Sequence, residues 1–281
     1  MLGEPGQVLR AAVLGSPIAH SLSPVLHRAG YTAAGLEGWS YEAHEVDAPG
    51  LPGFLDGLDD HWRGLSLTMP LKEVAVGLAT SVDEVARRTR AVNTLVRRPD
   101  GGWNGTNTDV LGLVRALRPH LPQGAGRAMV LGSGATARSA VLALAELGVS
   151  TVTVRARDPA KAADLLAWAL DARTGIRSGS VAALGPWLTA ADEVVVSTLP
   201  AAAGEVVART VPDQHRGVLL DVVYAGWPTP LARAGARAGM TVVSGLDMLV
   251  HQAGEQFRLF TGHGAPVAAM AAAGRAELER R

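Results

Sequence analysis

The chain has 281 residues, in which 26 lysines and arginines balance 26 aspartates and glutamates, and it contains no cysteine. This length allows one large domain or two ordinary ones, and the balanced charge gives no reason to expect nucleic acid or a membrane surface as a partner. Without cysteine there is no disulfide or thiolate metal site, and we expect no bound metal. Residues 1–10 lack the apolar stretch of a signal peptide and no segment is apolar enough to span a bilayer, so we expect a cytoplasmic globular protein.

The first part of the chain mixes strands and helices. An apolar run over residues 8–14 predicts a buried strand. Ser23 followed by Pro24 predicts an N-cap and a proline at the first helical position, in a helix that reaches residue 34. Asp109 is expected to begin a helix that ends before Pro119. Further strands are expected at residues 39–46 and 64–68, with a hairpin formed by 94–97 and 102–104.

The second part, from Arg127, alternates buried strands with helices. This order predicts a parallel sheet with helices on both faces, and therefore an α/β fold with a Rossmann-like, doubly wound domain. From Leu246 to Phe260 the apolar residues have helical spacing, which predicts a helical C-terminal end. The strands are expected at residues 128–131, 151–154, 194–197, 218–223 and 241–243, and a helix at 136–147.

A glycine-rich turn, G-x-G-x-x-A, follows the first of these strands and opens the helix. Gly132 permits the tight turn, Gly134 lets the backbone approach a pyrophosphate, and Ala137 allows close packing of helix on strand. The helix N-terminus also favours phosphate. This context predicts dinucleotide binding by residues of the turn, namely Gly132, Ser133, Gly134, Ala135 and Thr136.

Two arginines follow the next strand, where the choice between NAD and NADP is made. An acidic residue there holds the ribose 2′-hydroxyl of NAD, whereas arginine accommodates the 2′-phosphate of NADP. Arg155 and Arg157 therefore favour NADP, although Asp158 follows them and two solvated loop arginines remain an alternative.

Lysine is rare in this chain, which has 24 arginines but only Lys72 and Lys161. Arginine stays protonated in proteins, while lysine can lose its proton when its surroundings lower its pKa. One interpretation is that position 72 needs a proton that can leave; the alternative is chance usage.

Several segments, in order along the chain, resemble the shikimate dehydrogenase family, the actinobacterial type in particular. They are residues 15–24 (GSPIAHSLSP), 68–72 (TMPLK), 91–95 (AVNTL), 107–109 (NTD) and 245–249 (GLDML) with Gln252. The resemblance implies a substrate-binding domain of residues 1–109, completed by the C-terminal helices 246–281, and an NADP-binding domain of residues 110–245. It implies NADP as cofactor and shikimate or 3-dehydroshikimate as substrate, for a monomer or homodimer.

The resemblance also implies roles for individual residues. Lys72 and Asp109 are expected to be catalytic, and Ser21 and Ser23, helped by Tyr224, to bind the substrate carboxylate. Ring hydroxyls and the carbonyl are expected to contact Thr68, Asn93, Asp109 and Gln252, and Val222 and Gly245 are expected at the cofactor. Taken singly, these residues have structural alternatives: Ser23 as a helix cap, Asn93 as a partner of loop backbone, Tyr224 as a loop anchor and Gln252 as a solvated flank.

Three positions depart from the family pattern. Ser66 stands where many members have Asn, which leaves one ring-hydroxyl contact open. Arg155-Ala156-Arg157 replaces Asn-Arg-Thr, and residues 197–200 (STLP) replace Asn-Ala-Thr-Ser, which weakens the NADP placement.

The expected reaction is the reversible reduction of 3-dehydroshikimate with NADPH. Lys72 is expected to supply a proton, and Asp109 to orient the lysine and tune its pKa. The sequence does not show which of the two moves the proton, because their titrations would be coupled. One alternative is a quinate/shikimate dehydrogenase that uses NAD. Another is a catalytically silent nucleotide-sensing protein on the same fold.

Overall fold

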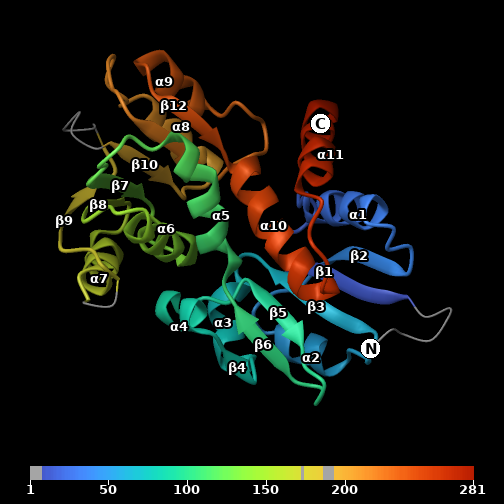
Figure 1. Ribbon diagram of the computed structural model, residues 1–281. Helices are drawn as coiled ribbons and strands as arrows, with labels where there is room; N and C mark the ends of the chain where they lie inside the picture. The colour runs from blue at the N-terminus through green and yellow to red at the C-terminus, as the bar shows by residue number, and fades with distance from the viewer. Residues whose placement is uncertain (1–7, 172–173, 186–192) are drawn as a thin grey trace. The chain divides into compact units, whose positions relative to one another are not determined.

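A computed structural model describes residues 8–171, 174–185 and 193–281. The chain divides into two compact units (Figure 1). The first unit consists of Met1–Thr108 and Leu249–Arg281, and the second unit is Asp109–Met248. The expectation about a signal peptide falls largely on residues 1–7, which lie outside the described residues. Among the described residues, no helix combines the length and apolarity needed to cross a membrane.

The first unit is built on a mixed six-stranded sheet in the order β2-β1-β3-β5-β6-β4. The edge strand β2 and its neighbours β1 and β3 run parallel, while β5 is antiparallel to both β3 and β6, as expected for the hairpin. The strands are β1 (Leu9–Gly15), β2 (Trp39–Glu45), β3 (Trp62–Leu67), β4 (Ser81–Val82), β5 (Thr94–Arg97) and β6 (Trp103–Thr106).

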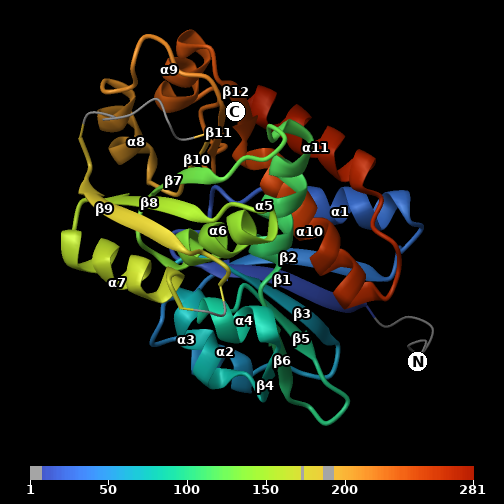
Figure 2. The same cartoon turned by 60° about the vertical axis from the view of Figure 1, so that its left-hand side comes forward.

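Helices cover this sheet, and their apolar residues form the core of the first unit. α1 and α11 pack side by side (Figures 1 and 2). Gly30 of α1 permits close approach, because a Cβ there would meet Phe257 at 3.1 Å and Met270 at 3.3 Å. The helices are α1 (Ser23–Ala33), α2 (Leu51–Asp56), α3 (Leu71–Leu78), α4 (Glu84–Thr89), α10 (Gly245–Thr261), which begins in the second unit, and α11 (Val267–Arg280).

The start of α1 corrects one expectation. Leu22 occupies the N-cap position and Ser23 is the first helical residue. The Ser21 hydroxyl accepts a hydrogen bond from the Ser23 backbone N–H at 3.3 Å. The prediction of Ser23 as the N-cap is therefore wrong. The helix begins one residue earlier than expected, and the side-chain acceptor for its first N–H is Ser21.

The second unit is a wholly parallel, doubly wound sheet in the order β12-β11-β10-β7-β8-β9. From β7 the chain runs outward through β8 and β9, then returns to the other side of β7 for β10, β11 and β12, which confirms the predicted fold class. The strands are β7 (Arg127–Leu131), β8 (Thr151–Ala156), β9 (Ser178–Ala183), β10 (Val194–Ser197), β11 (Val218–Asp221) and β12 (Thr241–Ser244). The helices are α5 (Thr108–Leu117), α6 (Ala135–Glu146), α7 (Pro159–Ala169), α8 (Ala201–Ala208) and α9 (Pro230–Ala238), with a 3₁₀ turn at Arg118–His120.

Candidate functional site

The glycine-rich turn lies between β7 and α6, as the sequence predicts. Gly132 has φ of +111°, and a Cβ on it would collide with the Thr198 hydroxyl. Its N–H donates to the Arg155 carbonyl at 2.8 Å, which ties the turn to β8. Ala137 is fully buried. Glycine is therefore required at position 132 by both backbone conformation and space, and a small residue at 137 by packing.

The start of α6 has the properties of an anion site. Gly134 is its N-cap, no side chain caps the helix, and a Cβ at Gly134 would stand in open space. Gly134 is exposed, and Ser133, Ala135 and Thr136 are partly exposed. An uncapped N-terminus with an accessible backbone presents N–H groups and a positive dipole end to a phosphate, so these residues fit a dinucleotide pyrophosphate.

The turn also stands where the strand order of the sheet reverses. β8 lies on one side of β7 and β10 on the other, and ligands of open α/β sheets bind outside the carboxyl ends of the strands at such a point. Thr198, directly after β10, donates its hydroxyl hydrogen to the Leu131 carbonyl at 2.9 Å. Thr198 was not among the predicted site residues, although its place at the end of a strand next to β7 was a usable signal.

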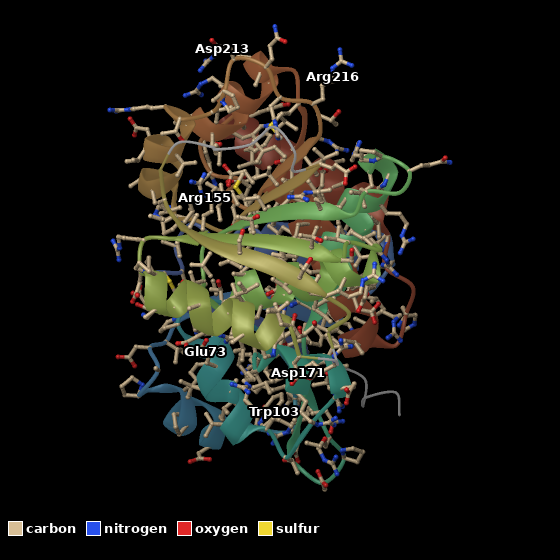
Figure 3. The ribbon with its side chains drawn as sticks, turned by 90° about the vertical axis from the view of Figure 1, so that its left-hand side faces the viewer. Glu73, Trp103, Arg155, Asp171, Asp213 and Arg216 are labelled. Carbon is tan, nitrogen blue, oxygen red and sulfur yellow. The ribbon has the colours of Figure 1, made fainter. Side chains whose placement is uncertain are left out.

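The two predicted arginines have different surroundings, because β8 extends to Ala156: Arg155 lies within the strand, where the sequence had placed it after the strand, and only Arg157 follows it. Arg155 (labelled in Figure 3) is 5% exposed and its Nε donates to the Ala183 carbonyl of β9 at 3.2 Å. Arg157 is exposed. Asp158 is the N-cap of α7, and its carboxylate accepts from the N–H groups of Ala160 and Lys161. The Asp158 carboxylate, which weighed against NADP in the sequence, thus has a structural role in capping a helix.

Val222 and Gly245, both predicted at the cofactor, lie against each other in the second unit. A Cβ on Gly245 would collide with the Val222 carbonyl, so the backbones approach as closely as glycine allows. Asp221 was not among the predicted site residues and is 2% exposed. Burial raises the pKa of its carboxyl, although it accepts a hydrogen bond from Thr229 at 2.7 Å. Tyr224 follows in the same loop and is partly buried.

In the first unit, Asn93 and Gln252 meet although 159 residues separate them. Asn93 Nδ2 donates to Gln252 Oε1 at 2.9 Å. Asn93 Oδ1 accepts from the Thr108 N–H at 2.8 Å, and Asn93 is 1% exposed. Gln252 lies on α10 and is partly exposed. The sequence predicted both residues for one site, and the structure brings their side chains into direct contact.

The lysine segment adjoins this pair. Thr68 connects β3 to α3, and Lys72 is the second residue of α3 and partly buried. The Lys72 carbonyl accepts from the Val92 N–H at 2.7 Å, which fixes the lysine segment to the segment that carries Asn93. Ser21 is partly buried and Ser23 is 5% exposed, at the start of α1.

Asp109 lies in the first turn of α5 and is fully buried. It is the first residue of the second unit, whereas Lys72 belongs to the first unit. An ionised carboxylate in such a position must be compensated by hydrogen bonds or a cation. The pairing of Asp109 with Lys72, and the placement of Tyr224 beside Ser21, stay predictions.

Comparisons with known proteins agree with this picture. Residues 13–95 match the family described as "Shikimate dehydrogenase substrate binding domain", and residues 245–273 match "Shikimate 5'-dehydrogenase C-terminal domain". The chain is 38% identical to the shikimate dehydrogenase (NADP(+)) of Halorubrum lacusprofundi over 278 residues, covering 95% of this chain and 98% of the relative.

Solved structures give the same result in three dimensions. The chain is similar to Mycobacterium tuberculosis shikimate dehydrogenase with a TM-score of 0.85 and 46% identity, covering 95% of this chain and 99% of that one. It is also similar to the Thermus thermophilus enzyme solved with NADP(H) and shikimate, with a TM-score of 0.79 and 33% identity, covering 96% and 99% of the two chains.

Proposed function

The chain belongs to the shikimate dehydrogenase family, and on this basis we propose that it catalyses the reversible NADP-dependent reduction of 3-dehydroshikimate to shikimate. Relatives named as NADP-dependent shikimate dehydrogenases match nearly the whole chain, so both the substrate-binding part and the nucleotide-binding part are present. The reaction belongs to the shikimate pathway of aromatic amino-acid biosynthesis. The enzyme is an oxidoreductase that acts on a secondary alcohol.

The observation that carries the proposal is the contact between Asn93 and Gln252 beside the lysine segment. Two uncharged amides, a threonine and a lysine provide hydrogen-bond donors and acceptors together with one cation. A small polyol acid needs such a set, since each hydroxyl that leaves water needs a new hydrogen-bond partner. We assign Thr68, Asn93, Asp109 and Gln252 to the ring, and Ser21, Ser23 and Tyr224 to the carboxylate.

Lys72 and Asp109 are the proposed catalytic residues. When bound, the nicotinamide of NADP supplies the hydride chemistry. As the ketone is reduced its oxygen gains negative charge, and a protonated Lys72 stabilises this charge and donates a proton. Asp109 favours the protonated lysine and orients it.

For NADP we assign the pyrophosphate to the turn of Gly132, Ser133 and Gly134 with Ala135 and Thr136 of α6. Arg155 and Arg157 are proposed for the 2′-phosphate. Arg157 is the exposed member of the pair, while Arg155 also holds the edge strand β9 through Ala183. Val222 and Gly245 complete the cofactor site.

The roles of the two units follow from these assignments. We propose that the first unit binds the substrate and the second unit binds NADP. We further propose a cytoplasmic monomer or homodimer that needs no nucleic acid or membrane partner, in keeping with the balanced charge of the chain.

Purified protein mixed with shikimate and NADP tests the proposal. We expect NADPH absorbance to rise and 3-dehydroshikimate to form in equal amount. The Lys72→Ala variant serves as the blank, and we expect its signal to be lower by about 10²–10⁴-fold. Cofactor binding without any shikimate-dependent signal would contradict the proposal and favour the nucleotide-sensing alternative.

A further inference from the structure

A continuous series of buried hydrogen bonds leads from β2 through α10 to the Asn93–Gln252 pair. The Tyr41 hydroxyl donates to Ser66 at 2.6 Å, and Ser66 donates to Gln256 Oε1 at 2.9 Å. Gln256 Nε2 donates to the Thr94 hydroxyl at 3.0 Å, and Thr94 donates to Asn93 Oδ1 at 2.8 Å. Every member lies in the first unit, and those that precede Gln252 are at least 95% buried: Tyr41, Ser66, Gln256, Thr94 and Asn93. We call these five residues the relay.

One backbone group fixes the direction of this series. The Thr108 backbone N–H can only donate, so the Asn93 atom 2.8 Å from it is the amide oxygen. Asn93 Nδ2 then faces Gln252, which must present its own oxygen. Thr94, bonded to the same Asn93 oxygen, must donate there, and is left with its oxygen as an acceptor for Gln256 Nε2.

The same reasoning continues to Tyr41. Because Gln256 presents its amino group to Thr94, its carbonyl oxygen faces Ser66, which must donate. Ser66 then accepts from the Tyr41 hydroxyl. The Asn93 backbone carbonyl, 3.5 Å from Gln256 Nε2, can only accept and supports the same orientation. Reversing any one member would set two donors or two acceptors against each other.

The consequence for the site is that the Gln252 amide has one permitted orientation. Its oxygen is occupied by Asn93, so its amino group is the end it can offer to a ligand. Asn93 uses its oxygen for Thr94 and Thr108 and its amino group for Gln252 and the Thr108 hydroxyl, at 3.1 Å. Ser66, at the position where the family pattern left a ring-hydroxyl contact open, instead bonds Tyr41 and Gln256.

We propose that Gln256 is a positioning residue, which acts through Thr94 and Asn93 to hold the amino group of Gln252 toward an acceptor oxygen of the substrate. This inference rests on the proposed function, since it concerns the same substrate site. Gln256 touches no reacting atom in this scheme. It supports the direction that the Thr108 N–H sets, because its amino group keeps the Thr94 hydroxyl hydrogen on Asn93 Oδ1. Its loss weakens substrate binding more than the chemical step.

Replacing Gln256 by glutamate distinguishes a role in hydrogen bonding from a role in packing alone, because only the hydrogen bonds change with protonation. A protonated carboxyl has one O–H donor and one carbonyl acceptor, and so reproduces the pattern of the amide. The ionised carboxylate only accepts, which turns the Thr94 hydroxyl hydrogen away from Asn93. Burial raises the pKa of a carboxyl, to about 8–9 in documented buried sites, so both forms are accessible in one assay range.

The groups around Gln256 do not obscure this titration. His27 of α1 is fully buried and burial lowers its pKa to about 3, so it stays neutral. Burial also raises the pKa of Tyr41 of β2 and of Tyr31 of α1, so both phenols stay protonated. The charged residues on the neighbouring elements are Arg28 on α1, Glu42 and Glu45 on β2, Arg63 on β3, Arg97 on β5, Asp247, Glu255 and Arg258 on α10, and Arg275, Glu277, Glu279 and Arg280 on α11.

The measurement is KM for shikimate and for NADP at several pH values, for Gln256→Glu and wild type. We expect KM for shikimate near the wild-type value at the acidic end and about tenfold higher at the alkaline end, the loss of one hydrogen bond. KM for NADP should match wild type throughout. Gln256→Met, which cannot regain the pattern, should show the raised KM at every pH. Gln123→Glu, at an exposed glutamine, controls for the added charge.

A ratio of shikimate KM to wild type that stays near one at all pH values would overturn the proposal. If Gln256→Glu does not fold at alkaline pH, Thr94→Val decides, since it keeps the volume and removes the hydroxyl: a raised shikimate KM supports the relay and an unchanged one refutes it. Failure of the proposed function would look different, because wild type itself would then show no shikimate-dependent NADPH signal.

Discussion

Lys72 is the residue on which the chemical argument depends. Charge alone would be supplied equally by arginine, which this chain uses 24 times, whereas donation of a proton near neutral pH would not. We therefore expect Lys72→Arg to lower kcat by about 10²–10⁴-fold, almost as much as Lys72→Ala, with a smaller change in KM for shikimate. The assay is NADP reduction at saturating shikimate.

The chain supplies a matched control in Lys161, its other lysine, which is exposed on α7. Lys161→Arg should keep wild-type kcat. Near-normal turnover of Lys72→Arg across the pH range would show that the lysine is only an electrostatic anchor. The same series should include Asp109→Asn, for which we expect reduced kcat because the charge that tunes the lysine is removed.

Arg155 and Arg157 make the second prediction at this scale. Removing both should raise KM for NADP strongly and KM for NAD little, because charged hydrogen bonds to the 2′-phosphate are worth about 1.5–3 kcal/mol each. Arg157→Ala, at an exposed position, should leave the melting temperature unchanged, whereas Arg155→Ala should lower it, since Arg155 is 5% exposed and bonds β9. An equal rise in KM for NADP and for NAD would contradict this prediction and show that the arginines serve the stability of the fold.

At the scale of elements, the strand–turn–helix unit of β7 and α6 is the most constrained. Gly132→Ala should raise KM for NADP and lower stability by about 1–3 kcal/mol, because φ of +111° is strained for alanine and the new Cβ meets Thr198. Gly148→Ala is the control, as its φ is +95° but its Cβ would stand in open space. It should lower stability while leaving KM for NADP unchanged; an effect of both variants on KM would contradict the account.

How well the elements were predicted depended on their signals. The buried strands were found because continuous apolar runs as short as 194–197 and 218–221 favour a strand over a helix by their length. The short helices at 51–56, 71–78 and 84–89 were not predicted, since one or two turns give no reliable periodicity. The strand at 178–183 was also missed: its residues are small and largely exposed, and pairing with β8 defines it rather than its own composition.

The candidate site was predicted in part for a related reason. The glycine turn is local, so its role could be inferred from neighbouring residues. Asn93 and Gln252 were assigned by resemblance, and their contact depends on how α10 returns to the first unit. Gln256 and Ser66 carry no local signal at all, because a buried amide or hydroxyl shows its purpose only when its partners are known.

At the scale of the whole molecule, His27 makes stability depend on pH. It is fully buried and stacked on Tyr41 at 4.0 Å between ring centroids, and burial lowers its pKa to about 3, with a smaller opposing effect from Gln256. The unfolded chain, with an ordinary histidine pKa of about 6.5, therefore binds more protons than the native state between these values. The contribution of His27 to the free energy of unfolding is therefore fully present above about pH 6.5 and is lost as the pH is lowered toward 3.

Urea denaturation tests this directly. Between about pH 7.5 and pH 5 we expect His27 to account for a loss of about 2 kcal/mol in the free energy of unfolding. His27→Phe, which keeps a ring against Tyr41, should remove that part of the loss, whereas His120→Phe at an exposed histidine should retain it. An identical acid loss in wild type and His27→Phe would refute the role of His27.

Turnover of shikimate and quinate, each with NADP and with NAD, tests the central claim most directly. The account predicts the highest kcat/KM for shikimate with NADP, at least about tenfold above the other three combinations, since a site built to bond substrate hydroxyls and a 2′-phosphate discriminates against ligands that lack or misplace them. A higher kcat/KM for quinate with NAD, or no turnover in any combination, would contradict it.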